Sequence, residues 1–317
     1  MVLLSFVIPC YRSENTIEKV IDEIIETVSQ RPGYDYEIIA INDCSPDGVY
    51  EVLKGIAAKN NRVKLIYFAK NMGKHAAVLA GYSFARGEYV VCLDDDYQCP
   101  VYELWKLVEP VESDLCDIAT AEYIQKKETL LKRFGSEINT YMSQTMLGKP
   151  KELRFENFSV LKAFVVKEII KYKNPYPYLE GLSLRVTDRV MMVPMEERER
   201  GDNNKSGFTF SKSFALLVNG LTAFSVKPLR IATIIGCLFS AAGFLYGLVI
   251  IIRKLLSPAI PAGYSSMLSV LLFSGGLIMM MLGIIGEYIG RIYICINDSP
   301  QYVIRETINI SEKDNLL

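Results

Sequence analysis

The sequence predicts an α/β fold in which helices cover a mostly parallel sheet. Short apolar runs of strand length recur in the first hundred residues, at Leu3–Ile8, Glu37–Ile41, Val63–Phe68 and Tyr89–Leu93. Segments with helical character lie between these runs. Regular alternation of strand and helix is typical of a parallel sheet with right-handed crossovers.

The expected helices follow from the spacing of apolar residues. Between Ile17 and Val28, apolar side chains recur at i, i+3, i+4, i+7, i+8 and i+11, which places them on one face of a helix. Asn15, followed by Glu18, is a suitable start for this helix. Two further helices are expected, at 47–59 and 74–85.

The pattern is weaker beyond Pro110. Asp117–Ala121 is compatible with a fifth strand, and Leu130–Met146 with a long amphipathic helix. Asn174–Tyr178 contains two prolines and is expected to be an extended or turning loop, because a proline disfavours helix at the residue before it. Glu196–Lys205 is a charged stretch, which a solvated surface segment would also explain.

The last third of the chain predicts membrane insertion. Ile231–Ile252 and Met267–Gly286 are uncharged over 22 and 20 residues, and about 20 residues cross the core of a bilayer. Buried helices of a soluble protein are the alternative, but two such spans in series are hard to bury otherwise. Two crossings place both termini on one side, expected to be the cytosol because the first residues lack the features of a signal peptide. Arg253 and Lys254 would lie in the outer loop, against the positive-inside tendency.

An apolar stripe precedes the first span and predicts an amphipathic helix in the membrane interface, with a core-facing helix as the alternative. Its residues recur with helical spacing: Phe210, Phe214, Leu217, Leu221 and Phe224. The expected organisation is a cytosolic domain over 1–207, an interface helix over 208–227, transmembrane helices over 228–254 and 265–296, and a cytosolic tail over 297–317.

Composition disfavours several classes of function. The 35 Lys and Arg residues balance 36 Asp and Glu residues, so the chain has no basic field for nucleic acid. Seven cysteines without a C-x-x-C pair, and a single histidine, His75, argue against a zinc site and suit a reducing compartment. Neither G-x-G-x-x-G nor a P-loop is present, so dinucleotide binding and ATP hydrolysis lack their motifs.

Acidic residues follow two of the expected strands, where ligands of doubly wound sheets bind. Asp43 follows the second strand, and Asp94-Asp95-Asp96 follow the fourth. At alternate positions, Asp94 and Asp96 can share one Mg²⁺ or Mn²⁺ ion, whose shell substrate phosphates complete. An acidic surface loop is the alternative. However, the residues just before Asp94 are wholly apolar, and a charge so close to a core needs a partner.

Two further side chains are candidates for nucleoside contacts. Asp43 would hydrogen-bond a ribose or a base edge, although a turn or cap residue is the simpler interpretation of this residue alone. Tyr11, at the end of the first strand, could stack its ring on a base. His75 is more simply a structural histidine than a catalytic base.

Four segments together resemble glycosyltransferase family 2: Ser5–Tyr11, Glu37–Ser45, Asn71–Lys74 and Asp94–Pro100. The two apolar spans and Gly283–Tyr293 resemble its polyprenyl-phosphate branch, the bactoprenol glucosyltransferases related to dolichol-phosphate mannose synthase. This resemblance runs from about residue 3 to residue 305. It implies a GT-A (Rossmann-like) domain, a nucleotide-sugar donor with uridine as the preferred base, and a D-x-D metal. It also implies inverting transfer onto polyprenyl (undecaprenyl) phosphate at the cytosolic face of a bacterial plasma membrane, for modification of cell-envelope glycans.

The resemblance implies residue roles as well. The implied metal ligands are Asp94 and Asp96, which would be catalytic together with the basic residues Arg200 and Lys205. The implied nucleotide-binding residues are Pro9, Tyr11, Glu14, Asp43, Asp94 and Gln98. The chain departs from the family at Glu122, where an arginine is common, and at Asn157, where many members begin an Asp-Phe-Arg-Leu run. A role of that aspartate as a base therefore cannot be transferred.

Two other functions remain open. A non-catalytic, membrane-tethered sugar-nucleotide binder or accessory subunit is disfavoured by the intact pair Asp94 and Asp96. A processive polysaccharide synthase is disfavoured because Trp105 is the only tryptophan, so the Gln-x-x-Arg-Trp motif of those enzymes is absent. A homo-oligomer is expected, since the small residues Gly275, Gly276 and Gly283 could let membrane helices pack closely.

Overall fold

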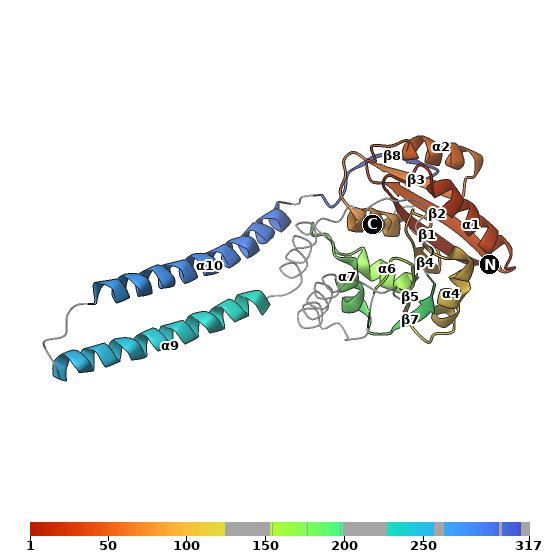
Figure 1. Cartoon of the computed structure of the whole chain (residues 1–317). Helices are drawn as coiled ribbons and strands as arrows, with labels where there is room; N and C mark the ends of the chain where they lie inside the picture. The colour runs from red at the N-terminus through yellow and green to blue at the C-terminus, as the bar shows by residue number, and fades with distance from the viewer. Residues whose placement is uncertain are drawn as a thin grey trace. The chain divides into compact units, whose positions relative to one another are not determined.

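The structure is a computed structural model that describes residues 1–123, 153, 155–175, 177–196, 198, 227–256, 263–297 and 300–311. The chain divides into two compact units (Figure 1). The first comprises residues 1–144, 149–208 and 298–317 and contains the sheet. The second comprises residues 145–148 and 209–297 and contains two long helices.

The sheet of the first unit has eight strands in the order β7-β5-β6-β4-β1-β2-β3-β8. Their bounds are β1 (Val2–Cys10), β2 (Tyr34–Asn42), β3 (Val63–Phe68), β4 (Tyr89–Cys92), β5 (Ile118–Tyr123), β6 (Ser159–Lys162), β7 (Val190–Met195) and β8 (Ile304–Ile308). Strands β4, β1, β2 and β3 pair in parallel, as do β5 and β7. Strand β6 is antiparallel to β4 and β5, and β8 is antiparallel to β3. The predicted α/β fold is confirmed, with a parallel centre inside a mixed sheet.

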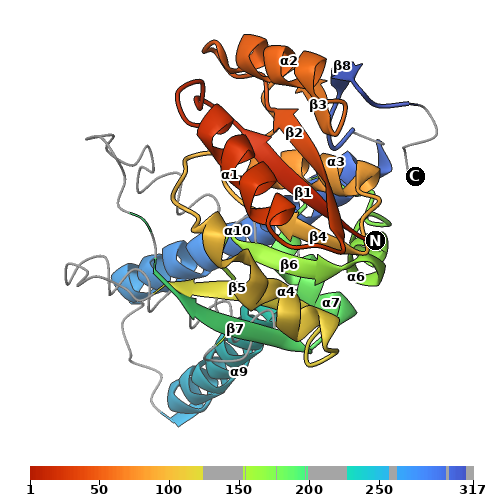
Figure 2. The ribbon, with the colours of Figure 1, turned by 90° about the vertical axis from the view of Figure 1, so that its right-hand side faces the viewer.

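Helices cover both faces of this sheet (Figure 2). One face carries α1 (Ile17–Ser29), α2 (Val49–Lys59) and α4 (Leu104–Glu112), which follows the 3₁₀ turn η1 (Val101–Glu103). The other face carries α3 (Lys74–Phe84), α6 (Ala163–Ile169) and α7 (Leu179–Val186). Alternate residues of β1, such as Phe6, and the buried stripe of α1, such as Ile21, belong to one hydrophobic core. Full burial of each such side chain contributes about 1.5–3 kcal/mol.

Gly81 lets α3 approach the sheet closely. A Cβ atom at this position would lie 2.8 Å from Cδ1 of Ile41 and closer still to Cγ1 of Val7. Only glycine therefore permits this packing, which buries Ala76–Phe84. This close contact fixes the position of α3 on the sheet. It therefore also fixes how far Lys74, the first residue of α3, extends toward the carboxyl edge.

Asp117 holds the strands on the other side of β4 together. Its Oδ1 accepts a hydrogen bond from Nζ of Lys162 at 3.0 Å, and its Oδ2 accepts one from Oγ1 of Thr187 at 2.8 Å. Burial alone would raise the pKa of Asp117, but the hydrogen bonds from Thr187 and Lys162 outweigh it and hold that pKa below its usual range. The ionised carboxylate therefore stabilises this part of the sheet.

The structure extends the predicted elements and adds others. All four early strands and the three early helices are confirmed, and the expected fifth strand corresponds to β5. Helix α2 begins at Val49 rather than at Asp47, and Oδ2 of Asp47 accepts a hydrogen bond from the backbone N–H of Glu14 at 3.0 Å. Strands β6, β7 and β8 were not predicted. The segments Leu130–Met146 and Phe210–Phe224 lie outside the described residues.

The second unit contains α9 (Lys227–Leu256) and α10 (Tyr264–Ile296), which lie side by side as a hairpin (Figure 1). The rings of Phe239 and Phe273 pack with centroids 5.2 Å apart. Many large apolar side chains of both helices are exposed. Within the described residues, one stretch of 24 residues, Phe273–Ile296, is long and apolar enough to cross a membrane, and α9 contributes a shorter apolar stretch, Ala232–Tyr246.

Candidate active site

The loops that follow β1, β2, β3 and β4 meet at the carboxyl edge of the sheet. Three non-glycine residues in these loops have left-handed backbone: Arg12 (φ 60°), Cys44 (φ 50°) and Tyr97 (φ 63°). Such conformations persist only where the surroundings hold them, and they cluster at functional sites. These left-handed residues thus lie at the same edge of the sheet where the sequence predicts the acidic residues.

Asp94 follows β4 and already has two partners. Its Oδ1 forms an ion pair with Nζ of Lys74 at 2.5 Å, and its Oδ2 accepts a hydrogen bond from Nδ2 of Asn157 at 2.5 Å. Asp96, two residues on, accepts a hydrogen bond from the backbone N–H of Gln98 at 3.2 Å. The sequence predicted that Asp94 would pair with a divalent cation, whereas the side chain that pairs with it in this structure is Lys74, which was not predicted as its partner.

A metal ion at this edge would receive few ligands from the described part of the chain. Those residues contain no group of three or more His, Cys, Asp or Glu side chains that could hold a metal ion. Asp94 and Asp96 alone offer two carboxylates, so oxygen atoms of a substrate would have to complete the coordination shell.

Asp95 ties two of the loops together. The backbone N–H of Tyr11 donates to its Oδ2 at 2.8 Å, and Oγ1 of Thr16 donates to its carbonyl oxygen at 2.6 Å. Burial raises the pKa of Asp95 to about 6. The sequence predicted no role for Asp95. Side chains alternate along an extended chain, and this alternation already sets the Asp95 side chain apart from those of Asp94 and Asp96.

Asp43 shapes the loop that leads into α3. Its Oδ1 accepts a hydrogen bond from the N–H of Met72 at 2.6 Å, and its Oδ2 accepts one from the N–H of Gly73 at 2.8 Å. Gly73 is the N-cap of α3 and has φ +86°, a conformation that favours glycine. Burial raises the pKa of Asp43, and the two N–H groups partly oppose this shift. The carboxylate therefore positions Lys74, and each oxygen keeps a second lone pair for a ligand.

The other predicted nucleotide-binding residues flank this loop. Pro9 is buried in β1, while the ring of Tyr11 beyond it is 44% exposed. Oε2 of Glu14 accepts a hydrogen bond from the N–H of Gly48 at 2.6 Å, which satisfies the first turn of α2. Glu14 thus has a local structural partner, whereas the Tyr11 ring is largely open to solvent, with Cζ of Arg12 at 5.5 Å from its centroid.

Gln98 is joined to Arg198, a residue that sequence reasoning missed. The N–H of Arg198 donates to the carbonyl oxygen of Gln98 at 3.2 Å. The guanidinium of Arg198 donates to both carboxylate oxygens of Glu23, at 2.7 and 2.5 Å, and these bonds raise the pKa of Arg198. Its Cζ atom also lies 4.4 Å from the ring centroid of Tyr97 and 4.9 Å from that of Tyr102. One side chain therefore fixes the loop that carries Asp96.

The sequence offered little signal for this role, because Arg198 stands in a run of charged residues. The two basic residues proposed from that run, Arg200 and Lys205, lie outside the described residues. Glu122 is half-buried in β5, where it pairs in register with Pro194 of β7.

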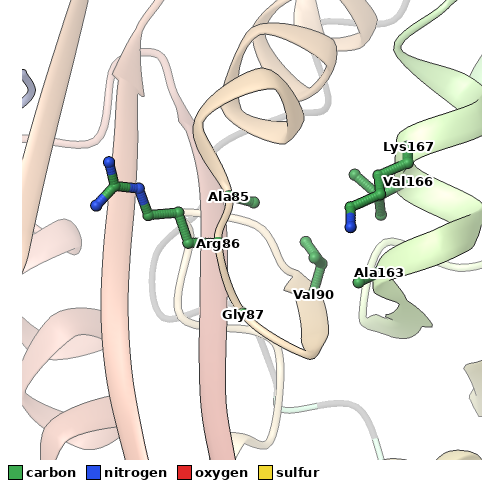
Figure 3. Close-up of a pocket in the computed structure, with 7 residues that line it drawn as sticks. All are labelled: Ala85, Arg86, Gly87, Val90, Ala163, Val166 and Lys167. Atoms are coloured by element: carbon green, nitrogen blue, oxygen red, sulfur yellow. The ribbon is translucent and has the colours of Figure 1, made fainter. Parts of the chain in front are cut away.

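In the described part of the chain, two cavities lie beside β4. One, of about 160 Å³, is lined by residues around Gly87 and Val90, and the guanidinium of Arg86 points away from the other labelled residues (Figure 3). The other, of about 80 Å³, is lined by residues that include Lys74 and Asn157. Only the second adjoins the side chains that hold Asp94.

Comparison with known proteins identifies the family. The sequence profile described as glycosyl transferase family 2 matches residues 5–169, and that of the GtrB C-terminal hairpin matches residues 227–292. The chain belongs to glycosyl transferase family 2. The matched regions contain the loops described above and most of the α9–α10 hairpin, so the resemblance found in the sequence is confirmed.

Relatives of this glycosyltransferase match over nearly its whole length. A putative glycosyltransferase, CsbB of Bacillus subtilis, is 32% identical and covers 98% of this chain and 94% of the relative. The SfII prophage-derived bactoprenol glucosyl transferase of Shigella flexneri is 30% identical and covers 96% and 98%. Glucosyl-3-phosphoglycerate synthase of Mycobacterium tuberculosis, solved with Mn²⁺, UDP and phosphoglyceric acid, shares the fold, with a TM-score of 0.53, 18% identity and coverage of 70% and 78%.

Proposed function

We propose that this glycosyltransferase transfers one monosaccharide, with inversion, from a UDP-sugar to polyprenyl (undecaprenyl) phosphate for modification of cell-envelope glycans. The supporting observation is the presence of two parts in one chain. Asp94 and Asp96 lie at the carboxyl edge of a family 2 domain, and a GtrB hairpin follows that domain. Relatives matched across both parts are named bactoprenol glucosyl transferases.

Asp94 and Asp96 would hold a Mg²⁺ or Mn²⁺ ion. The residues present fit such an ion, because carboxylate oxygens are its preferred ligands and Asp94 already attracts the cationic Lys74. Neighbours of the same fold have been solved with Mn²⁺ or Mg²⁺ and UDP. When bound, the ion would neutralise the charge that develops on the departing diphosphate.

The nucleoside would lie against the loops that follow β1 and β2. Tyr11 offers an exposed ring for stacking, and Asp43 offers lone pairs for a ribose or base edge. Pro9, Glu14 and Gln98 complete the proposed nucleotide site. Lys74, at the start of α3, adds positive charge beside the diphosphate, where the positive end of the helix dipole also lies.

The acceptor phosphate needs little help from a base. One of its oxygens, anionic at neutral pH, would attack the anomeric carbon as the bond from that carbon to the diphosphate breaks, which inverts the configuration. Because the acceptor needs little help from a base, the presence of Asn157, a neutral amide beside Asp94, is compatible with this mechanism. Arg200 and Lys205 would supply positive charge to the lipid phosphate near the bilayer surface.

Strand β8 supports a topology of two membrane crossings. It follows α10 in the chain and pairs with β3, and Nδ2 of Asn309 donates to the carbonyl oxygens of Ala57 and Val63 at 2.7 and 2.8 Å. The segments before α9 and after α10 therefore belong to one domain, and they would lie on one side of a membrane that α9 and α10 cross. We place that domain in the cytosol of a bacterial cell, with α9 and α10 as the two crossings and a homo-oligomer as the working assembly.

Activity assays of the purified protein test the metal site. With nucleotide sugars, polyprenyl phosphate and Mn²⁺, Asp96→Ala should lower kcat by on the order of 10³-fold, since several kcal/mol of charge stabilisation depend on the ion. Asp22→Ala, at an exposed position of α1, is the matched control and should retain full activity. Near-normal turnover of Asp96→Ala, or full activity in EDTA, would contradict the proposal.

A second variant separates use of the acceptor from use of the donor. Arg200→Ala should reduce transfer to the lipid while leaving Mn²⁺-dependent binding of the nucleotide sugar largely intact. If transfer is unaffected, or if a soluble sugar serves equally well as acceptor, the lipid-phosphate part of the proposal is wrong.

A further inference from the structure

The chain after α10 returns to the sheet, and we call residues 300–311 the C-terminal arm. Strand β8 is the second part of this arm and lies beside β3 at the edge of the sheet (Figure 2). The first part, residues 301–303, lies where β3 ends at Phe68. We call residues 69–73 the donor loop, because they lead from β3 to α3 beside the proposed nucleotide site. The arm therefore reaches this loop from a part of the chain that follows the α9–α10 hairpin.

Tyr302 joins the two elements that flank the donor loop. Its ring stacks on that of Phe68, the buried last residue of β3, with centroids 5.5 Å apart and ring planes 2° from parallel. On α3, Oγ of Ser83 lies 3.4 Å from the hydroxyl oxygen of Tyr302. Since Oγ of Ser83 donates its own proton to the carbonyl oxygen of Leu79 at 3.1 Å, the Tyr302 hydroxyl is the donor in this contact. One side chain thus connects the end of β3 with α3.

The residues on either side of this tyrosine add hydrogen bonds. The backbone N–H of Ala69, the first residue of the donor loop, donates to the carbonyl oxygen of Val303 at 2.9 Å. Nε2 of Gln301 donates to the carbonyl oxygens of Tyr172 and Asn174, at 2.8 and 2.7 Å. These two carbonyls belong to the segment between α6 and α7. Gln301 therefore fixes the start of the arm, and Val303 fixes the start of the donor loop.

The other end of the donor loop is held by the proposed nucleotide site. The backbone N–H groups of Met72 and Gly73 donate to the carboxylate of Asp43. Nδ2 of Asn71 donates to the carbonyl oxygen of Asp43 at 3.0 Å. The residue after the loop is the lysine that pairs with Asp94. A short loop held at both ends is preorganised, and preorganisation lowers the entropy cost of binding a ligand.

We propose that Tyr302 and Gln301 are positioning residues of the donor site. They hold the donor loop in the conformation that presents Asp43 to the nucleoside and Lys74 to the diphosphate. In this role neither side chain needs to contact the nucleotide, because both act through the loop. The inference rests on the proposed function, and it adds a dependence of donor binding on residues that follow the α9–α10 hairpin.

Calorimetric titration of the full-length protein in detergent with UDP and Mn²⁺ tests the effect on binding. Tyr302→Ala should weaken the binding of UDP about 10-fold, the loss expected when binding must also order about one residue of the loop. Tyr302→Phe keeps the stacked ring and removes only the long contact with Ser83. It should therefore retain the wild-type Kd within about 2-fold.

Two amides of the arm provide a matched pair of variants. Gln301 and Asn309 each donate to two backbone carbonyl oxygens. Those that bind Asn309 belong to Ala57 and Val63, at the opposite end of β3 from the donor loop. Because Asn309 also has left-handed backbone (φ 60°), its replacement by alanine disturbs the arm at least as much as that of Gln301. Gln301→Ala should weaken the binding of UDP about 3-fold, whereas Asn309→Ala should leave the Kd unchanged.

Hydrogen exchange without ligand tests the donor loop directly. In Tyr302→Ala and in Gln301→Ala, the amide protons of a peptide that covers residues 69–74 should exchange faster than in the wild-type protein, because the loop opens more often. In Asn309→Ala the exchange of this peptide should be unchanged.

The outcomes separate this inference from the function on which it rests. An unchanged Kd of UDP, or unchanged exchange of the loop, in both Tyr302→Ala and Gln301→Ala would overturn the inference, as would equal weakening in Asn309→Ala. If Tyr302→Ala does not fold, the comparison of Gln301→Ala with Asn309→Ala decides in the same way. Wild-type protein that binds no UDP would contradict the proposed function itself, while the exchange data would still show whether the arm positions the loop.

Discussion

Replacing Arg198 by alanine should loosen the loop that carries Asp96 without disrupting the sheet. The guanidinium makes two hydrogen bonds with Glu23 and stacks against two tyrosine rings. The side chains of Arg198 and Glu23 are 24% and 13% exposed, so this ion pair is more protected from solvent than a surface pair. The variant would also leave the Glu23 carboxylate without its cation.

The magnitude follows from these contacts. Hydrogen bonds between charged groups contribute about 1.5–3 kcal/mol, and exposed cation–π contacts about 0.5–1 kcal/mol. Partial solvation of the pair and its side-chain entropy offset part of this sum, which leaves a local loss of about 2 kcal/mol. Tyr97, at φ 63°, would then be free to leave its left-handed conformation. We expect the affinity for Mn²⁺ in the presence of UDP to fall about 10-fold, or about 1.4 kcal/mol.

Calorimetric titration of Mn²⁺ into the UDP-bound protein measures this effect. Arg31→Ala is the matched control, since Arg31 pairs with Glu109 at 2.9 Å and stacks on Trp105 at 4.4 Å, away from the site. It should change stability without changing the Kd of Mn²⁺. Arg198→Lys should recover little, because lysine lacks the planar fork of arginine. Wild-type Mn²⁺ affinity in Arg198→Ala, or equal weakening in Arg31→Ala, would refute the reasoning.

Three further predictions concern the fold and topology. Asp117→Asn should lower the free energy of unfolding by about 1–2 kcal/mol at pH 7. The pKa of Asp117 in the folded protein lies below the unfolded value of about 3.9. In acid unfolding experiments, the difference between the two proteins should therefore vanish as the pH falls through the folded-state pKa. Gly81→Ala should destabilise by about 1–3 kcal/mol in urea titrations, through overpacking against β1 and β2, whereas Gly55→Ala in α2, with open space around it, should be neutral or stabilising. The topology can be tested by cysteine labelling in a chain whose three cysteines that are not buried have been replaced. In intact cells, an impermeant thiol reagent should label Ala262→Cys but not Asn60→Cys. Labelling at position 60 would contradict the topology.

The part of the fold predictable from sequence is the part stabilised by local periodicity. Strands β1 to β4 and helices α1 to α3 alternate over short distances, and their apolar spacing matches their burial. The position of Asp94 and Asp96 just after β4 could be predicted for the same reason, because charged residues directly follow a short apolar run.

The rest of the fold and of the site depends on contacts between residues that are distant in the sequence. Strand β8 pairs with β3 across more than half of the chain, and no local pattern distinguishes Ile304–Ile308 from a tail. Arg198 meets Glu23 at a separation of 175 residues, which composition cannot indicate. The ion pair between Lys74 and Asp94 was missed although both residues were named in motifs, because their contact depends on the close packing of α3 on the sheet.

The anomeric configuration and mass of the lipid product test the central claim most directly. Purified protein would be incubated with an α-linked UDP-hexose, polyprenyl phosphate and Mn²⁺, and the lipid would be analysed by mass spectrometry and NMR. Our account predicts a polyprenyl phosphate that carries a single hexose in β linkage. An α-linked hexose, a lipid that carries a chain of sugars, or hexose transfer to water alone would contradict it.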